Sequence, residues 1–156
     1  MLVAEKRTMP STHTALDYHL VFSTKERRPL IDENWRDSLH AFLGGCIRQA
    51  GGVASRVGGT VDHVHLAVGL RPMHCLADVL RDIKRASSVW VHDTVGVSEF
   101  AWQEGYGAFT FSRRDLDSVV QYIESQEEHH RHRTFQEEYR AILESLGVTF
   151  DERYLW

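Results

Sequence analysis

The chain has 156 residues, 42% of them hydrophobic and 26% charged, which fits one domain with a sizeable core and excludes a disordered chain. No apolar run is long enough to cross a bilayer, and residues 1–10 lack the apolar core of a signal peptide, so we expect a cytoplasmic protein. The net charge of −4 excludes a uniformly basic nucleic-acid binder and leaves only local basic groups for such a role.

The first half of the chain predicts a strand, a helix and two further strands. Residues 13–24 alternate apolar and polar side chains, as a half-buried strand does, with Leu16, Tyr18, Leu20 and Phe22 on one face. Asp32 is placed to cap a helix that runs to about residue 50, where two glycines end it. Residues 53–58 and 61–70 are predicted strands joined by a turn.

The second half predicts a helix, a strand and two more helices. Apolar residues keep helical spacing from Met73 to about His92, and the aromatic, glycine-rich residues 100–111 indicate a strand interrupted near Gly105. Ser112 and Thr134 are each followed three residues later by an acidic residue, which is typical of a helix start. The apolar stripes of the two helices are Leu116, Val119, Val120 and Ile123, and then Phe135, Tyr139, Ile142, Leu143 and Leu146.

The first six elements follow the order β-α-β-β-α-β, which predicts an α+β fold with a ferredoxin-like sheet and two helices on one face. The opposite face is left for a site or for the helix that begins near Ser112, and a helical tail follows. No repeat, low-complexity tract or linker interrupts the chain. We therefore expect a single domain over residues 1–156, with its core at about 13–130 and its tail at about 131–156.

Two histidines on the third predicted strand form the clearest candidate site. Side chains of a strand alternate, so Val64 and Leu66 point toward the two helices while His63 and His65 share the other face. Two imidazoles at this spacing can bind one divalent ion. A pair of exposed histidines without a ligand is the competing interpretation. We interpret His19 as structural. His129, His130 and His132 could add a ligand, but a solvated histidine cluster is the favoured interpretation.

A tyrosine and a glutamine on the helix after Ser112 form the second candidate. Tyr122 and Gln126 are four residues apart and lie on one helix face, beside the apolar stripe. A helix docked by that stripe on the open sheet face brings both side chains to the edge of the contact, within reach of the histidines. An ordinary, partly buried tyrosine is the alternative.

The combination supports a specific chemistry. Two imidazoles and an amide oxygen form an incomplete coordination shell that leaves positions for water and a phosphate oxygen. A tyrosine hydroxyl has a pKa near 10, so only roughly a thousandth is ionised at pH 7, and polarising the phosphate makes Tyr122 a useful nucleophile. The resulting phosphotyrosine ester conserves the bond energy, so rejoining needs no ATP, which agrees with the lack of a phosphate-binding glycine loop in the sequence.

Basic residues gather in three short groups that are candidates for DNA binding. They are Lys25, Arg27 and Arg28, then Lys84 and Arg85, then Arg113 and Arg114. The aromatic residues between Trp102 and Phe111 are candidates for stacking on bases, although packing against the sheet explains them equally well.

These motifs resemble those of the single-tyrosine HUH transposases of small insertion sequences and of the related REP-associated tyrosine transposases. The HUH motif is His63-Val64-His65, and the tyrosine helix is residues 122–126. Residues 18–25, 83–88 and 100–109 are similar to the opening strand, the second helix and the segment before the tyrosine helix. The resemblance covers about residues 13–130, and the acidic net charge departs from what a DNA-binding family suggests.

The resemblance implies that Tyr122 cleaves single-stranded or hairpin DNA, leaves a 5′-phosphotyrosine and a free 3′-hydroxyl, and so mobilises an insertion sequence. It implies that His63, His65 and Gln126 bind Mg²⁺ or Mn²⁺. It also implies a homodimer in which the tyrosine helix of one subunit meets the histidines of the other, although the REP-associated branch includes monomers. Two alternatives stay open: a hairpin-binding regulator without catalysis, and a metal-dependent phosphoesterase that uses water.

Overall fold

The computed structural model describes residues 11–155. The expectation that residues 1–10 carry no signal peptide lies outside these residues, as does Trp156 at the end of the tail. None of the helices within the described range is long and apolar enough to span a bilayer.

A four-stranded antiparallel sheet forms the centre of the fold. Its strands are β1 (Leu16–Ser23), β2 (Val53–Gly59), β3 (His63–Leu70) and β4 (Gly107–Phe111), in the order β2-β3-β1-β4. Each neighbouring pair is antiparallel. This strand order is the one that a split β-α-β-β-α-β unit produces, with β1 and β3 in the middle. The predicted α+β class is confirmed.

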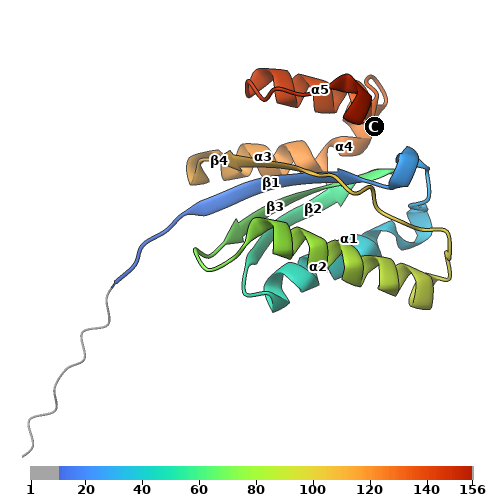
Figure 1. Ribbon diagram of the computed structural model, residues 1–156, viewed down its shortest axis with the longest axis horizontal. Coiled ribbons are helices and arrows are strands. Elements are labelled where there is room, and N and C mark those ends of the chain that lie inside the picture. Colours follow the sequence, from blue (N-terminus) through green and yellow to red (C-terminus); the bar gives the residue numbers. More distant parts are fainter. Residues whose placement is uncertain (1–10, 156) are drawn as a thin grey trace, which may run out of the picture.

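Two helices cover one face of this sheet, α1 (Glu33–Gln49) and α2 (Leu76–Trp90) (Figure 1). The Asp32 side chain accepts a hydrogen bond from the backbone of Asn34 and caps α1, as predicted. The main hydrophobic core lies between these helices and the sheet. It contains Leu20, Phe22, Val64, Leu66 and Val68 from the strands, and Leu39, Leu43, Leu80 and Ile83 from the helices.

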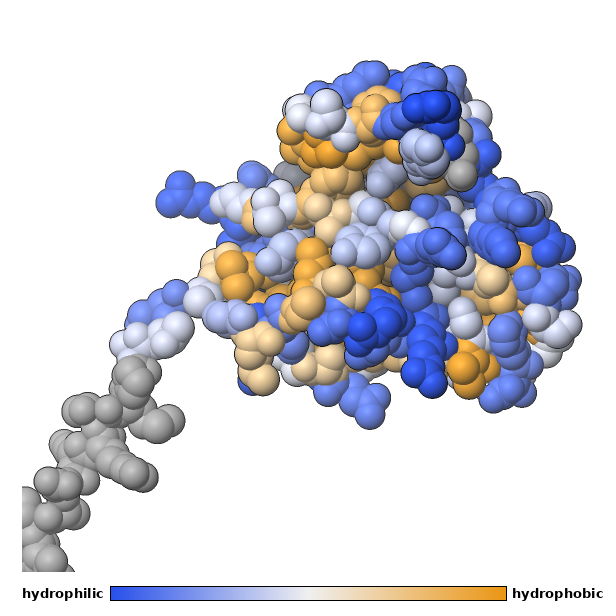
Figure 2. Space-filling view, viewed as in Figure 1, coloured by the Kyte–Doolittle hydropathy of each residue, from blue (hydrophilic) through white to orange (hydrophobic). Residues whose placement is uncertain are grey.

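Three helices lie on the opposite face: α3 (Leu116–Glu124), α4 (Gln126–His130) and α5 (Phe135–Ser145) (Figure 1). The helix α3 packs so closely on β2 that a β-carbon at Gly58 would lie 2.6 Å from the carbonyl oxygen of Ile123. Likewise α5 places Tyr139 against Gly107 of β4, where an added β-carbon would meet the tyrosine ring at 2.9 Å. Figure 2 shows apolar side chains gathered where α5 meets the sheet. Glycines at these two positions let both helices approach the sheet.

Some predicted boundaries are wrong. The strand expected over residues 100–111 is limited to β4, and before it Trp102 makes only an isolated bridge to Thr24. The second helix begins at Leu76 rather than Met73. The tyrosine helix is divided at Ser125, whose backbone leaves the α-helical region, so Gln126 begins a separate short helix. In the tail, the predicted capping box of Thr134 and Glu137 is present, while Leu146 is exposed rather than packed.

Candidate metal and nucleophile site

The two histidines of β3 lie in the interior on the face away from α1 and α2. His63 and His65 are both 0% exposed, because α3 and α5 cover this side of the sheet. Val64, which lies between the two histidines in the sequence, and Leu66, which follows them, belong to the main core on the other face. The alternation of strand side chains thus separates a polar side from an apolar side, as predicted.

Each imidazole is held at its Nδ1 atom. In His63 this atom lies 2.7 Å from a carboxylate oxygen of Asp62 and 3.0 Å from the Thr60 hydroxyl. Burial acts to raise the pKa of Asp62, but the hydrogen bonds from His63 and Thr60 outweigh it and hold that pKa below its usual value. The ionised carboxylate accepts the Nδ1 proton and leaves the lone pair of Nε2 for a ligand.

His65 is held by a third histidine. Its Nδ1 atom lies 2.8 Å from Nε2 of His19, which comes from the neighbouring strand β1, and the two rings stack with centroids 5.0 Å apart. Burial lowers the pKa of His19 to about 4 and that of His65 well below its usual value. Both rings are therefore neutral at neutral pH. The Nε2 atom of His65 is buried and makes no hydrogen bond.

The amide of Gln126 faces both the histidines and the tail. Its oxygen lies 3.2 Å from Nε2 of His63, while its nitrogen donates to Glu138 at 3.0 Å. Gln126 is 1% exposed, so this amide is part of the interior. The acceptor at its nitrogen fixes which end of the amide points to His63, and this end is the oxygen.

The tyrosine meets the histidines of its own chain. Its ring centroid lies 5.8 Å from those of His19 and His65, with edge-on packing. The hydroxyl of Tyr122 donates to the carboxylate of Glu138, which is contributed by α5. A single chain thus assembles both predicted motifs in one place.

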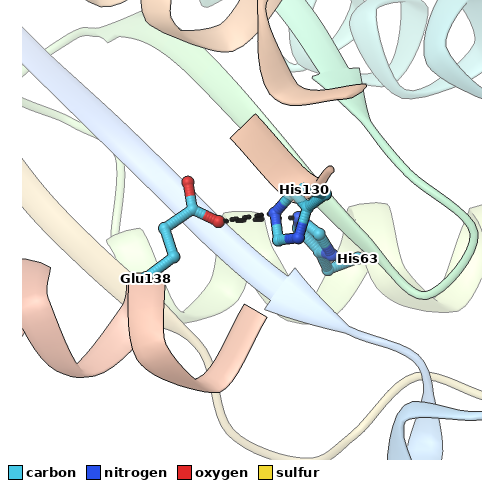
Figure 3. A group of neighbouring side chains, drawn as sticks. All are labelled: His63, His130 and Glu138. Atoms are coloured by element: carbon cyan, nitrogen blue, oxygen red, sulfur yellow. Dashed lines mark hydrogen bonds and ion pairs between the residues drawn. The ribbon is translucent and has the colours of Figure 1, made fainter. Parts of the chain in front are cut away.

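Two further groups complete the cluster. The side chain of Glu138 is buried and accepts a hydrogen bond of 2.7 Å from Nε2 of His130, whose ring lies 4.5 Å from that of His63 (Figure 3). Burial raises the pKa of Glu138 to about 7, although His63 acts to lower it. Burial also lowers the pKa of His130 to about 4. Ligand atoms of His63, His130 and Glu138 all lie within 4.8 Å of one another.

The arrangement fits a divalent cation. Nε2 of His63 and the oxygen of Gln126 present lone pairs to each other at 3.2 Å, a separation that suits two ligands at right angles on one ion, about 3 Å apart. Nε2 of His65 is a buried acceptor without a donor, which is costly unless a cation binds it. Imidazole nitrogens and an amide oxygen are suitable ligands for Mn²⁺ or Mg²⁺.

Sequence reasoning missed two members of this cluster, His19 and Glu138, and did not favour a third, His130. We expected His19 to be structural, and we favoured a solvated cluster for His130 over an added ligand, yet both side chains line the site. A signal for His19 was available, because strand alternation puts it on the face of β1 opposite Leu20 and Phe22. The signal for Glu138 was weaker: an acidic residue three positions after Phe135, beside the apolar face of the tail helix.

The predicted basic groups lie outside this cluster. Lys84 donates to the backbone carbonyls of Gln103, Glu104 and Gly105 at 2.6, 3.0 and 3.1 Å, and Arg113 forms an ion pair of 2.9 Å with the buried Asp17. Arg27 is half-buried, and the exposed members are Lys25, Arg28, Arg85, Arg114 and the ion-paired Arg113. The groove between α2 and residues 101–106 is lined by basic and aromatic side chains, including Arg85, Trp102 and Tyr106.

The fold and the sequence both match known transposases. Residues 12–126 match the family model described as "Transposase IS200 like". Among solved structures, a protein of Deinococcus radiodurans R1 provisionally assigned as a transposase has a TM-score of 0.60 and 25% identity, covering 77% of this chain and 97% of that one. A REP-associated tyrosine transposase bound to a REP hairpin has a TM-score of 0.57 and 15% identity, covering 78% of this chain and 74% of that one.

None of the curated protein sequences matches significantly. The family match spans most of the chain, and the protein therefore belongs to the IS200-like transposases.

Proposed function

We propose that this transposase cleaves and rejoins single-stranded DNA through a 5′-phosphotyrosine on Tyr122, and thereby mobilises an insertion sequence. The observation that carries the proposal is the contact of the Tyr122 ring with His65, which shares its buried strand face with His63. His63, His65 and Gln126 would hold Mg²⁺ or Mn²⁺, and such an ion supplies positive charge that polarises a phosphate group. The hairpin bound to the REP-associated relative supports DNA hairpins as substrates.

The chemical step exchanges one phosphodiester for another. The Tyr122 oxygen attacks phosphorus and forms the new ester bond, and the bond from phosphorus to the 3′ oxygen breaks. The hydroxyl proton leaves Tyr122 and the 3′ oxygen takes up one proton, so no net charge or oxidation change occurs. Attack by a 3′-hydroxyl on the phosphotyrosine reverses the step and joins a strand. The phenolic ring is held for attack by its contacts with His19 and His65.

The test uses a hairpin-bearing oligonucleotide labelled at its 3′ end, because the 3′ fragment is the one that stays on the tyrosine. We expect a labelled protein–DNA adduct on denaturing gels for the wild type and none for Tyr122→Phe. The matched control is Tyr139→Phe, which removes a hydroxyl from another half-buried tyrosine near the site and should keep the adduct. Adduct formation by Tyr122→Phe would overturn the assignment.

The same experiment separates the two alternatives. A water-using phosphoesterase would cut the oligonucleotide without any adduct, and a binding regulator would retain the hairpin uncut. Binding itself should favour hairpins over a blunt duplex and weaken with salt, because the exposed cations Lys25, Arg28, Arg85 and Arg114 would contact phosphates.

We also propose a homodimer formed through β4, which ends the sheet order and is therefore an edge strand. In a dimer, the tyrosine helix can serve its own histidines, as in this chain, or those of the partner. Mixing Tyr122→Phe and His63→Ala chains distinguishes the two arrangements. Recovered cleavage in verified heterodimers supports the shared site, and continued inactivity supports sites within single chains.

A further inference from the structure

The tail helix α5 sends one carboxylate into the candidate metal site. Its capping box at Thr134 and Glu137 fixes where the helix begins, and Phe135 then stacks on the ring of His63 with centroids 4.3 Å apart. Glu138 follows three residues later, on nearly the same face of the helix, and is only 6% exposed. Figure 3 shows its carboxylate reaching toward His130 and His63. The carboxylate accepts hydrogen bonds from Tyr122, Gln126 and His130, and a bound cation would in addition compensate its charge in the interior.

The two carboxylate oxygens face the two metal-binding nitrogens. One oxygen lies 3.9 Å from Nε2 of His65 and the other 4.0 Å from Nε2 of His63. These distances are too long for hydrogen bonds. Ligand atoms that each lie about 2.1 Å from a shared ion can be at most about 4.2 Å apart, so both separations are compatible with binding one cation.

The neighbours of Glu138 favour this role for it over one for His130. The Nε2 atom of His130 donates a hydrogen bond of 2.7 Å to the carboxylate of Glu138, so this nitrogen has no lone pair for an ion and instead orients the carboxylate. The predicted set of His63, His65 and Gln126 carries no formal charge and contains a single oxygen ligand. Mg²⁺ and Mn²⁺ prefer oxygen ligands, carboxylates above all. A carboxylate supplies the missing oxygen and the missing negative charge.

We propose that Glu138 is a fourth protein ligand of the metal ion, contributed by the C-terminal helix to the set of His63, His65 and Gln126. The inference rests on the metal site of the proposed function. Because the same carboxylate accepts the hydrogen bond of the Tyr122 hydroxyl, it would also connect the nucleophile to the ion. The family match ends at residue 126, so this ligand lies outside the matched segment.

The test measures Mn²⁺ binding by the full chain with electron paramagnetic resonance, which counts free and bound ion without any DNA. Glu138→Gln keeps the size of the side chain and removes its charge, and we expect about 10-fold weaker binding or a larger loss. The matched control is Glu144→Gln, which makes the same charge change at an exposed position of the same helix and should bind within about twofold of the wild type. Equal affinity of Glu138→Gln and the wild type would overturn the proposal.

Two further measurements keep the outcome unambiguous. His65→Ala should lose Mn²⁺ binding; if it binds as well as the wild type, the proposed metal site itself fails, whereas loss in His65→Ala with none in Glu138→Gln rejects Glu138 alone. If Glu138→Gln does not fold, the waters on wild-type Mn²⁺ decide the question. An octahedral ion with four protein ligands retains about two waters, and three or more would reject Glu138 as a ligand.

Discussion

The two faces of β3 differ in what their side chains do. On one face Val64, Leu66 and Val68 are buried against α1 and α2 as members of the hydrophobic core. On the other face His63 and His65 are equally buried, but each makes a polar contact at Nδ1 and presents Nε2 toward other acceptors. One strand therefore supplies both the stability of the fold and the candidate site.

The difference shows how a small domain can carry a buried polar site. Burying a polar atom without a partner costs on the order of 1–3 kcal/mol, and His65 has such an atom at Nε2. The apolar face contributes the opposing free energy, because each fully buried aliphatic side chain stabilises the fold by roughly 1.5–3 kcal/mol. Substitutions on the two faces should accordingly affect different measurements.

The largest effect is expected from His65→Ala. This change removes one of the two strand ligands, and we expect complete loss of cleavage and of Mn²⁺ binding, with the hairpin still bound. The wild type should lose cleavage in EDTA and regain it with added Mn²⁺ or Mg²⁺, whereas the variant should not recover. His74→Ala serves as the control, because the hydrogen bonds of this imidazole go to the backbone of Arg71 and Ala50, away from the site. Undiminished cleavage in EDTA would show that the histidines have another role.

The sequence predicted the parts of the molecule that depend on local periodicity. Strand alternation placed His63 and His65 opposite Val64 and Leu66. The i to i+4 spacing placed Tyr122 and Gln126 on one side of a helix, and both line the site although the helix breaks at Ser125 between them. The caps at Asp32 and Thr134 were also readable, since each depends on side chains within three residues. These features need no knowledge of the tertiary structure.

Other features could not be read because they depend on contacts between distant segments. Glu138 enters the site only because α5 folds back over the sheet. The separation of Glu138 from His63 in the sequence does not indicate that the two side chains lie close together. The short β4 begins at Gly107, which allows close approach of Tyr139, another contact with the tail. The helix breaks at Ser125, and no proline or glycine near this position indicates the break in the sequence. Tertiary packing decides each of these positions.

An intermediate effect is expected from Leu66→Ala, the neighbour of His65 on the other face. Leu66 is 0% exposed, and removing its three outer carbons leaves a cavity between the sheet and the helices, so the free energy of unfolding should fall by about 2–5 kcal/mol. Urea denaturation measures this loss. Val89→Ala, at an exposed position of α2, should change stability by less than about 1 kcal/mol. Cleavage well below the melting temperature should persist in Leu66→Ala, and its loss in a folded protein would contradict the division of the two faces.

The smallest effect is expected from His19→Phe, which tests whether the polar face needs its supporting residue. The aromatic ring keeps its packing against Tyr122, but the hydrogen bond between Nε2 of His19 and Nδ1 of His65 is lost, which removes the partner that fixes the tautomer and orientation of the His65 ring. We expect Mn²⁺ binding to weaken by about 10-fold to 100-fold, with cleavage restored at high Mn²⁺ concentration.

His92→Phe is the control, because that imidazole bonds to the Phe100 carbonyl away from the site. Restoration by excess metal separates His19 from a true ligand such as His65, whose loss excess metal should not repair. If His19→Phe binds Mn²⁺ as tightly as the wild type, the orientation of His65 must come from its strand and its packing alone.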